Sequence, residues 1–104
     1  MNNITTEQFQ EKTQPNSGKQ IVVFSAAWCG PCKMLTPVLD SLAGEHEDVG
    51  FSKIDIEDEQ NLTVSLGISS VPTIMFYNNG EMKYRHIGAC TKNYMENFIG
   101  TYLT

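Results

Sequence analysis

Basic residues are scarce in this chain of 104 residues. Seven lysines and arginines stand against twelve aspartates and glutamates, which gives a formal net charge of -5 at neutral pH. A surplus of negative charge repels phosphate backbones and anionic lipid headgroups. We therefore expect neither nucleic acid nor a membrane surface among the partners.

Long apolar runs are also missing. No stretch approaches the roughly 20 residues that a membrane-spanning helix needs. The opening "MNNITTEQFQ" has no basic leader followed by an apolar run, which favours a cytoplasmic protein. Because no linker, internal repeat or low-complexity segment divides the chain, we expect residues 1–104 to form a single domain, and a monomer by default.

Cysteine is sparse as well, but two of the three cysteines lie close together. The stretch "AWCGPCK" holds Cys29 and Cys32 with only Gly30 and Pro31 between them. In a reducing cytoplasm a permanent disulfide is not expected, and an odd number of cysteines does not indicate a disulfide framework. These observations weaken the interpretation of the pair as a structural cross-link.

The pair is predicted to lie at a turn between a strand and a helix. Residues 20–28 form an almost unbroken apolar run, which is typical of a strand buried on both faces. Apolar residues then recur with helical spacing, so we expect a helix that begins near Cys29 and runs toward Gly44. Pro31 fits the first turn of such a helix because its missing N–H would have no partner there.

The rest of the chain predicts alternating strands and helices. This order favours an α/β architecture with helices on both faces of a layered sheet. The remaining expected elements are a brief strand at Ile4, a short helix around Phe9, a strand over 49–56, a helix over 58–66, a hairpin that turns at Asn79-Gly80, and a last helix capped by Thr91 whose core face includes Tyr94 and Phe98.

Two thiols at this spacing suit disulfide exchange. The thiolate is the attacking form, and the free N–H groups and dipole of a helix start stabilise negative charge at Cys29. Cys32, one turn inward, is placed to attack the sulfur of Cys29 once Cys29 has formed a mixed disulfide with a substrate. We therefore predict Cys29 as the nucleophile and Cys32 as the resolving cysteine, with Trp28 as an apolar surface for a protein partner.

The stretch "WCGPCK" resembles the active-site motif of thioredoxins, and the similarity extends over nearly the whole chain. "VPT" at 71–73 resembles the family's loop with a cis-proline, Pro37 its helix-kinking proline, "NNG" its hairpin turn, and Gly88 the glycine of its substrate groove. The resemblance implies a thioredoxin fold, with a central mixed sheet of about five strands flanked by four helices.

The same resemblance implies an activity and its partners. It implies a protein-disulfide reductase of cell redox homeostasis that needs no cofactor, is regenerated by a thioredoxin reductase and acts on oxidised client proteins. It also implies a cis Val71-Pro72 bond and a client segment whose backbone pairs with residue 71. The groove residues that it implies are Trp28, Gly30, Pro31, Val71, Pro72 and Gly88.

Two positions depart from the family pattern. Thioredoxins usually carry a buried aspartate six residues ahead of the first cysteine, thought to help deprotonate the second cysteine, and here that position is Val23. Ser25 stands where the family has a second tryptophan. Lys53 matches a lysine that neighbours the aspartate, so we expect it to face Val23 and at most to tune Cys32. Our hypothesis is that Cys32 loses its proton to water or to the departing thiolate.

Two other functions remain open at this point. A thioredoxin fold can serve as a non-catalytic interaction subunit, although a scaffold has no need of the intact "WCGPC". Within the redox class, Val23 and Ser25 suggest a thioredoxin restricted to particular partners.

A zinc site is a further alternative. Cys90 and His86 complete a formal set of three cysteines and one histidine. The long gap and the lack of a second metal-binding half-motif argue against it, so we predict no metal site, a buried apolar Cys90 and a packed His86.

Overall fold

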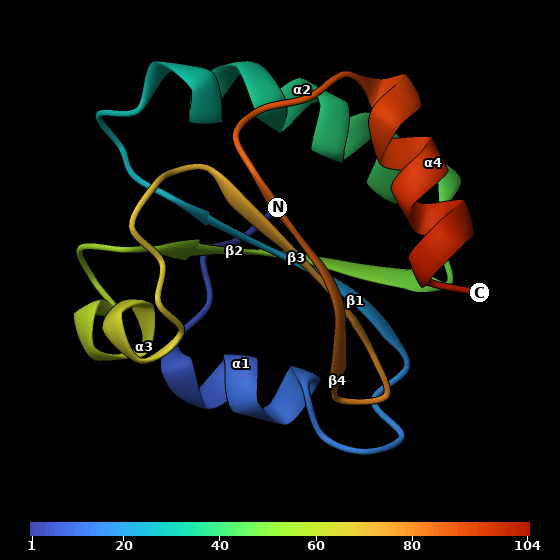
Figure 1. Cartoon of the computed structure of the whole chain (residues 1–104), viewed down its shortest axis with the longest axis horizontal. Coiled ribbons are helices and arrows are strands. Elements are labelled where there is room, and N and C mark those ends of the chain that lie inside the picture. The colour runs from blue at the N-terminus through green and yellow to red at the C-terminus, as the bar shows by residue number, and fades with distance from the viewer.

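Four strands form one mixed sheet with helices on both faces (Figure 1). The computed structural model describes all of residues 1–104. Strand β1 (Lys19–Ser25) lies parallel to β2 (Val49–Asp55) and antiparallel to β3 (Thr73–Asn78). Strand β4 (Glu81–Ile87) pairs with β3, which gives the order β2-β1-β3-β4 and confirms the α/β architecture.

The helices divide into two pairs. Figure 1 shows α2 (Gly30–Glu45) and α4 (Lys92–Tyr102) on one face of the sheet, and α1 (Thr6–Lys12) and α3 (Gln60–Ser65) on the other. None of the four is both long and apolar enough to span a membrane. The sheet is therefore covered on both sides, as the sequence predicts.

Strand β1 is apolar throughout because it contributes to two cores. Successive side chains of a strand point to opposite faces. Ile21 and Val23 pack in the cluster that contains residues of α2 and α4, whereas Val22 and Phe24 pack in the cluster that contains residues of α1 and α3. The apolar run thus marks the central strand of a sheet covered on both faces.

The expected fifth strand at Ile4 is absent, so the count of about five strands is wrong. Asn3 forms only an isolated parallel bridge with Lys53, beside which the Ile4 N–H donates to the Lys53 carbonyl oxygen at 2.8 Å. The next residue, Thr5, already caps α1 through its side-chain oxygen, which accepts from the Gln8 N–H. Because the helix begins there, the bridge cannot extend into a strand.

The turn and cap signals are confirmed, but one core prediction is wrong. Asn79 and Gly80 have φ values of 53° and 85°, as the tightest hairpin turns require. Thr91 caps α4 by accepting from the Tyr94 N–H. Phe98 packs against the core, yet Tyr94 is 59% exposed, because helical spacing does not show how far the partner surface extends beneath the first turn.

Candidate active site

Cys29 and Cys32 form a disulfide at the N-terminus of α2, with Cα atoms 5.3 Å apart. Cys29 is the N-cap residue, and its Sγ accepts a hydrogen bond from the Cys32 N–H at 3.2 Å. The two cysteines are only 4% and 7% exposed. When the pair is reduced, this N–H and the positive end of the helix dipole stabilise a thiolate on Cys29.

The backbone before the helix fixes the position of the first sulfur. Strand β1 ends at Ser25, and the chain turns so that the Cys29 N–H donates to the Ala26 carbonyl oxygen at 3.1 Å. Cys29 itself is extended, and Pro31 lies in the first turn, where its fixed φ suits a helix. The predicted helix start near Cys29 is confirmed.

A loop and an exposed aromatic residue border Cys29 on the outside. The Sγ of Cys29 lies 3.7 Å from the carbonyl oxygen of Val71. The Val71-Pro72 bond is cis, as the resemblance implies, and the Pro72 carbonyl oxygen accepts from the Gly88 N–H at 2.8 Å. Trp28 is 66% exposed. We call this side of the disulfide, with Trp28, Gly30 and Pro31 exposed, Val71 and Gly88 half-buried and Pro72 buried, the client rim.

Gly88 is held where a side chain would be strained. Its φ of 99° lies in the region that favours glycine, and an added Cβ would meet no atom within 4 Å. The requirement for glycine is therefore conformational, and it lets the chain turn at the end of β4, where the Gly88 N–H meets the cis-proline loop.

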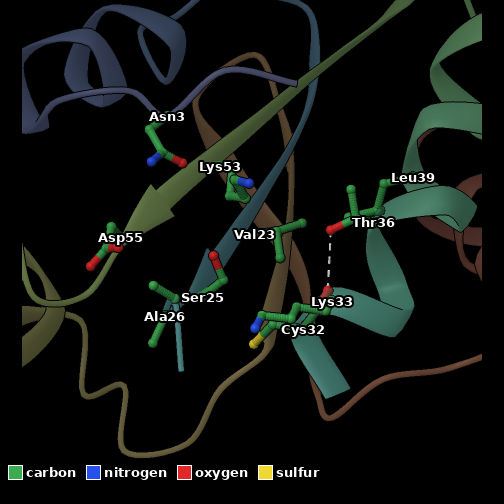
Figure 2. A pocket seen from close by; sticks show the side chains of 11 residues that line it. Asn3, Val23, Ser25, Ala26, Cys32, Lys33, Thr36, Leu39, Lys53 and Asp55 are labelled. Carbon is green, nitrogen blue, oxygen red and sulfur yellow. Dashed lines mark hydrogen bonds between the residues drawn. The ribbon is translucent and has the colours of Figure 1, made fainter. Parts of the chain in front are cut away.

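Cys32 borders a pocket on the inner side of the disulfide. The pocket has a volume of about 300 Å³ and lies between the sheet and the first turns of α2 (Figure 2). Val23, 2% exposed, is the strand neighbour of Lys53, so the predicted contact of these two positions is confirmed. The side chains that line this inner pocket are Asn3, Val23, Ser25, Ala26, Ala27, Cys32, Lys33, Thr36, Leu39, Lys53 and Asp55.

The third cysteine does not join the pair. Cys90 is half-buried rather than fully buried, and it packs against the core cluster under α2 and α4. Burial raises the pKa of its thiol. His86 packs on Phe98 with ring centroids 5.1 Å apart, as predicted. No three histidine, cysteine, aspartate or glutamate side chains gather in a group that could hold a metal ion.

Sequence reasoning missed Asp55. Asp55 ends β2, and the parallel register makes it the neighbour of Ser25, as Lys53 is the neighbour of Val23. These four residues alternate along two strands and therefore share the sheet face that α2 covers. Only the pairing of β1 with β2, which local sequence does not specify, brings this carboxylate to the inner pocket.

Comparisons with known proteins agree with this geometry. The sequence model of the thioredoxin family matches residues 1–101. The chain is 39% identical over 99 residues to a thioredoxin of Rickettsia felis, covering 94% of both chains. It is 34% identical to a thioredoxin of Porphyra purpurea over 97% of this chain and 95% of that one. A thioredoxin of Ophiophagus hannah is 38% identical over 85% of each.

These matches span nearly the whole chain and include the segment with the disulfide, so the interpretation as a non-catalytic subunit is not favoured. The chain belongs to the thioredoxin family, and its Cys29–Cys32 pair is the redox centre of a thiol-disulfide oxidoreductase that reduces protein disulfides.

Proposed function

We propose that Cys29 attacks the disulfide of a client protein and that Cys32 then releases the reduced client. The observation that carries this assignment is the asymmetry of the two sulfurs. The Cys29 Sγ lies at the helix start and beside the Val71 carbonyl oxygen of the client rim, whereas Cys32 faces the inner pocket. Cys29 thus borders the cis-proline loop, whereas Cys32 borders the inner pocket, although both sulfurs are largely buried.

The cycle has two exchange steps. The Cys29 thiolate attacks one sulfur of the client disulfide, forms a mixed disulfide and expels the other client sulfur as a thiolate, which takes up a proton. The Cys32 thiolate then attacks the Cys29 sulfur, which forms the Cys29–Cys32 bond and breaks the bond to the client. Two electrons pass from the dithiol to the client.

The client rim would hold an extended client segment. Its backbone would pair with residue 71, whose carbonyl oxygen already points at the Cys29 sulfur. Trp28 offers a flat apolar face for the client side chains. Gly30 and Gly88 carry no side chain and Pro72 is buried, so these positions together with Pro31 would allow a backbone to approach closely.

The partners follow from the same chemistry. A thioredoxin reductase would return the oxidised pair to the dithiol, because the pair itself is the only redox group that the cycle uses. Neither a cofactor nor a metal enters the exchange steps. We place the protein in the cytoplasm as a monomer with one domain over residues 1–104, where a reducing environment keeps the dithiol ready.

Insulin reduction by the purified protein in the presence of dithiothreitol tests the proposal. Wild type should turn over many equivalents of insulin, while Cys29→Ser and Cys32→Ser should fall to the dithiothreitol blank. Cys90→Ser is the matched control and should keep the wild-type rate, since Cys90 lies outside the pair. A wild type that does not exceed the blank would overturn the proposal and favour a structural role.

A further inference from the structure

Cys32 needs a proton acceptor before it can act as the resolving thiolate. It is 7% exposed, and Val23, which lines the same pocket, is apolar and cannot accept a proton. The acceptor must therefore reach Cys32 through the inner pocket or be the client sulfur itself. The side chains of the pocket distinguish these two routes.

The inner pocket is large and polar enough for water. A water molecule occupies about 30 Å³ in the liquid and needs two to four polar partners to be ordered. The pocket has a volume of about 300 Å³, and it is lined by the hydroxyls of Ser25 and Thr36 and by the charged groups of Lys53 and Asp55. Several water molecules can therefore connect these groups.

Asp55 is the only charged group of this pocket that can accept a proton. Lys33 on α2 and Lys53 on β2 also line it, but ammonium groups are donors only. One carboxylate oxygen of Asp55, Oδ1, accepts from the Glu57 N–H at 2.8 Å, which fixes the side chain. The other oxygen has no donor within the protein, so it is free to bind water.

Ser25 lines the inner pocket together with Asp55 and Cys32. It is the strand neighbour of Asp55, and Figure 2 shows it between Asp55 and Cys32 in that view. A serine hydroxyl can donate one hydrogen bond and accept others, so it can pass a proton along a chain of water.

We propose that Asp55 takes the proton of Cys32 through pocket water and the Ser25 hydroxyl while Cys32 resolves the mixed disulfide. This inference rests on the proposed function. The Cys32 S–H bond breaks as the Cys29–Cys32 bond forms, and the departing client thiolate later gains a proton from solvent. Asp55 touches neither sulfur, so it is a positioning residue that acts through water.

The expected effect is moderate. A well-placed general base contributes about 10² to 10⁴ in rate, and a base that acts through water contributes less. We expect loss of the Asp55 charge to slow the resolving step by about threefold to tenfold at neutral pH. The positive charges of Lys33 and Lys53 remain and continue to favour the thiolate.

The test separates the two exchange steps in time. Reduced protein is mixed with a disulfide-bonded peptide and quenched with acid, and mass spectrometry counts the mixed disulfide and the oxidised protein at each time and pH. Asp55→Asn keeps the oxygen that accepts from Glu57 and removes the charge. Asp58→Asn is the matched control, because Asp58 is exposed and does not line the inner pocket.

Asp55→Asn should let the mixed disulfide accumulate, with formation at the wild-type rate, and should flatten the pH profile of resolution. Asp58→Asn should behave as wild type, and Ser25→Ala should slow resolution less than Asp55→Asn does. The charge effect alone would speed resolution rather than slow it, because removing a negative charge favours the Cys32 thiolate. The thiolate fraction, measured by ultraviolet absorbance in a Cys29→Ser background, should therefore not fall in Asp55→Asn.

Two outcomes would overturn the inference. Wild-type resolution in Asp55→Asn would show that the client thiolate takes the proton, and equal slowing in Asp58→Asn would show an effect of net charge alone. Either result leaves the proposed function intact, provided that wild type reduces the peptide. A wild type that forms no mixed disulfide would remove the proposed function as well.

Discussion

The two sides of the disulfide differ in how closely they follow the family pattern. On the client rim, the motif residues, the cis-proline loop and Gly88 all stand where thioredoxins have them. On the inner side, Val23 and Ser25 replace an acid and an aromatic residue, and an open polar pocket lies next to Cys32. The comparison teaches that the residues of the client rim follow the family pattern, whereas the residues around Cys32 depart from it.

The largest expected difference in reactivity is between Cys29 and the third cysteine, Cys90. Burial raises the pKa of Cys90 above its ordinary value of 9.0, while the helix start stabilises a thiolate on Cys29. Only the thiolate reacts, so we expect iodoacetamide to modify Cys29 at least about 100 times faster than Cys90 at neutral pH.

Peptide mass mapping of the reduced protein over time would measure the two alkylation rates. The rate at Cys90 should rise only at alkaline pH, as its thiol begins to ionise. Unfolded protein in denaturant is the control, and there the two rates should converge. Equal rates in the folded protein would show that the helix N-terminus does not activate Cys29.

The variant Val23→Asp restores the acid of the family pattern on the inner side and so removes one difference between the two sides. Val23 is buried in the core, so Val23→Asp should lower the free energy of unfolding by about 2 kcal/mol, a factor of about 30 in the unfolding constant, despite the nearby Lys53. Urea unfolding measures this loss of stability. Val23→Asn is the control, because asparagine has the shape of aspartate without its charge.

The reduction rate of Val23→Asp carries the mechanistic information. If pocket water and Asp55 already serve Cys32, the second-order rate of disulfide reduction at neutral pH should change by less than about threefold. An acceleration well beyond that, in Val23→Asp and not in Val23→Asn, would mean that the missing base limits the wild type.

Trp28→Ala tests the opposite side. Trp28 is 66% exposed, so its removal should leave the unfolding midpoint nearly unchanged. Loss of one aromatic contact with a client costs on the order of 1.4 kcal/mol, which corresponds to about a tenfold rise in KM for a protein substrate. Val64→Ala is the matched control, since Val64 is 78% exposed on α3, across the sheet from α2. A similar rise in KM for both variants would show that the client rim is not the docking surface.

The smallest effect is expected at Lys53. Its ammonium lines the inner pocket with Cys32, but it is half-exposed and screened by solvent. Lys53→Met should slow resolution by about twofold, because a thiolate near a cation is only modestly favoured in water. Lys12→Met, on the other face of the sheet, should have no effect on that step. A loss of tenfold or more would make Lys53 a main determinant rather than a modulator.

Local signals in the sequence were sufficient for most of the fold. The Cys29 cap, the Asn79-Gly80 turn and the Thr91 cap depend on the chemistry of a few adjacent residues, so the sequence predicts them correctly. The prediction of a fifth strand is wrong because the Thr5 cap ends the extended segment after one bridge. The prediction of Tyr94 as a core residue is wrong because helical spacing does not reveal where the supporting surface ends.

Interactions between segments that are distant in the sequence were not predicted, because local patterns do not show which segments meet. His46 has three acidic neighbours in the sequence, but the carboxylate that it meets belongs to a distant segment, because its Nε2 lies 2.9 Å from an oxygen of Glu96 on α4. Asp55 reaches the inner pocket only through the register of two strands. The helix start at Cys29, the cis Val71-Pro72 bond and the pairing of Val23 with Lys53 were therefore predictable, whereas the position of Asp55 was not.

The most direct test of the division between the two sulfurs is to map the adduct that a client leaves on Cys32→Ser. The variant is reacted with a disulfide-bonded peptide, and the bound peptide is located by mass spectrometry. A single stable mixed disulfide at Cys29, absent from Cys29→Ser, is the predicted result. An adduct at Cys90, or none at all, would contradict the account.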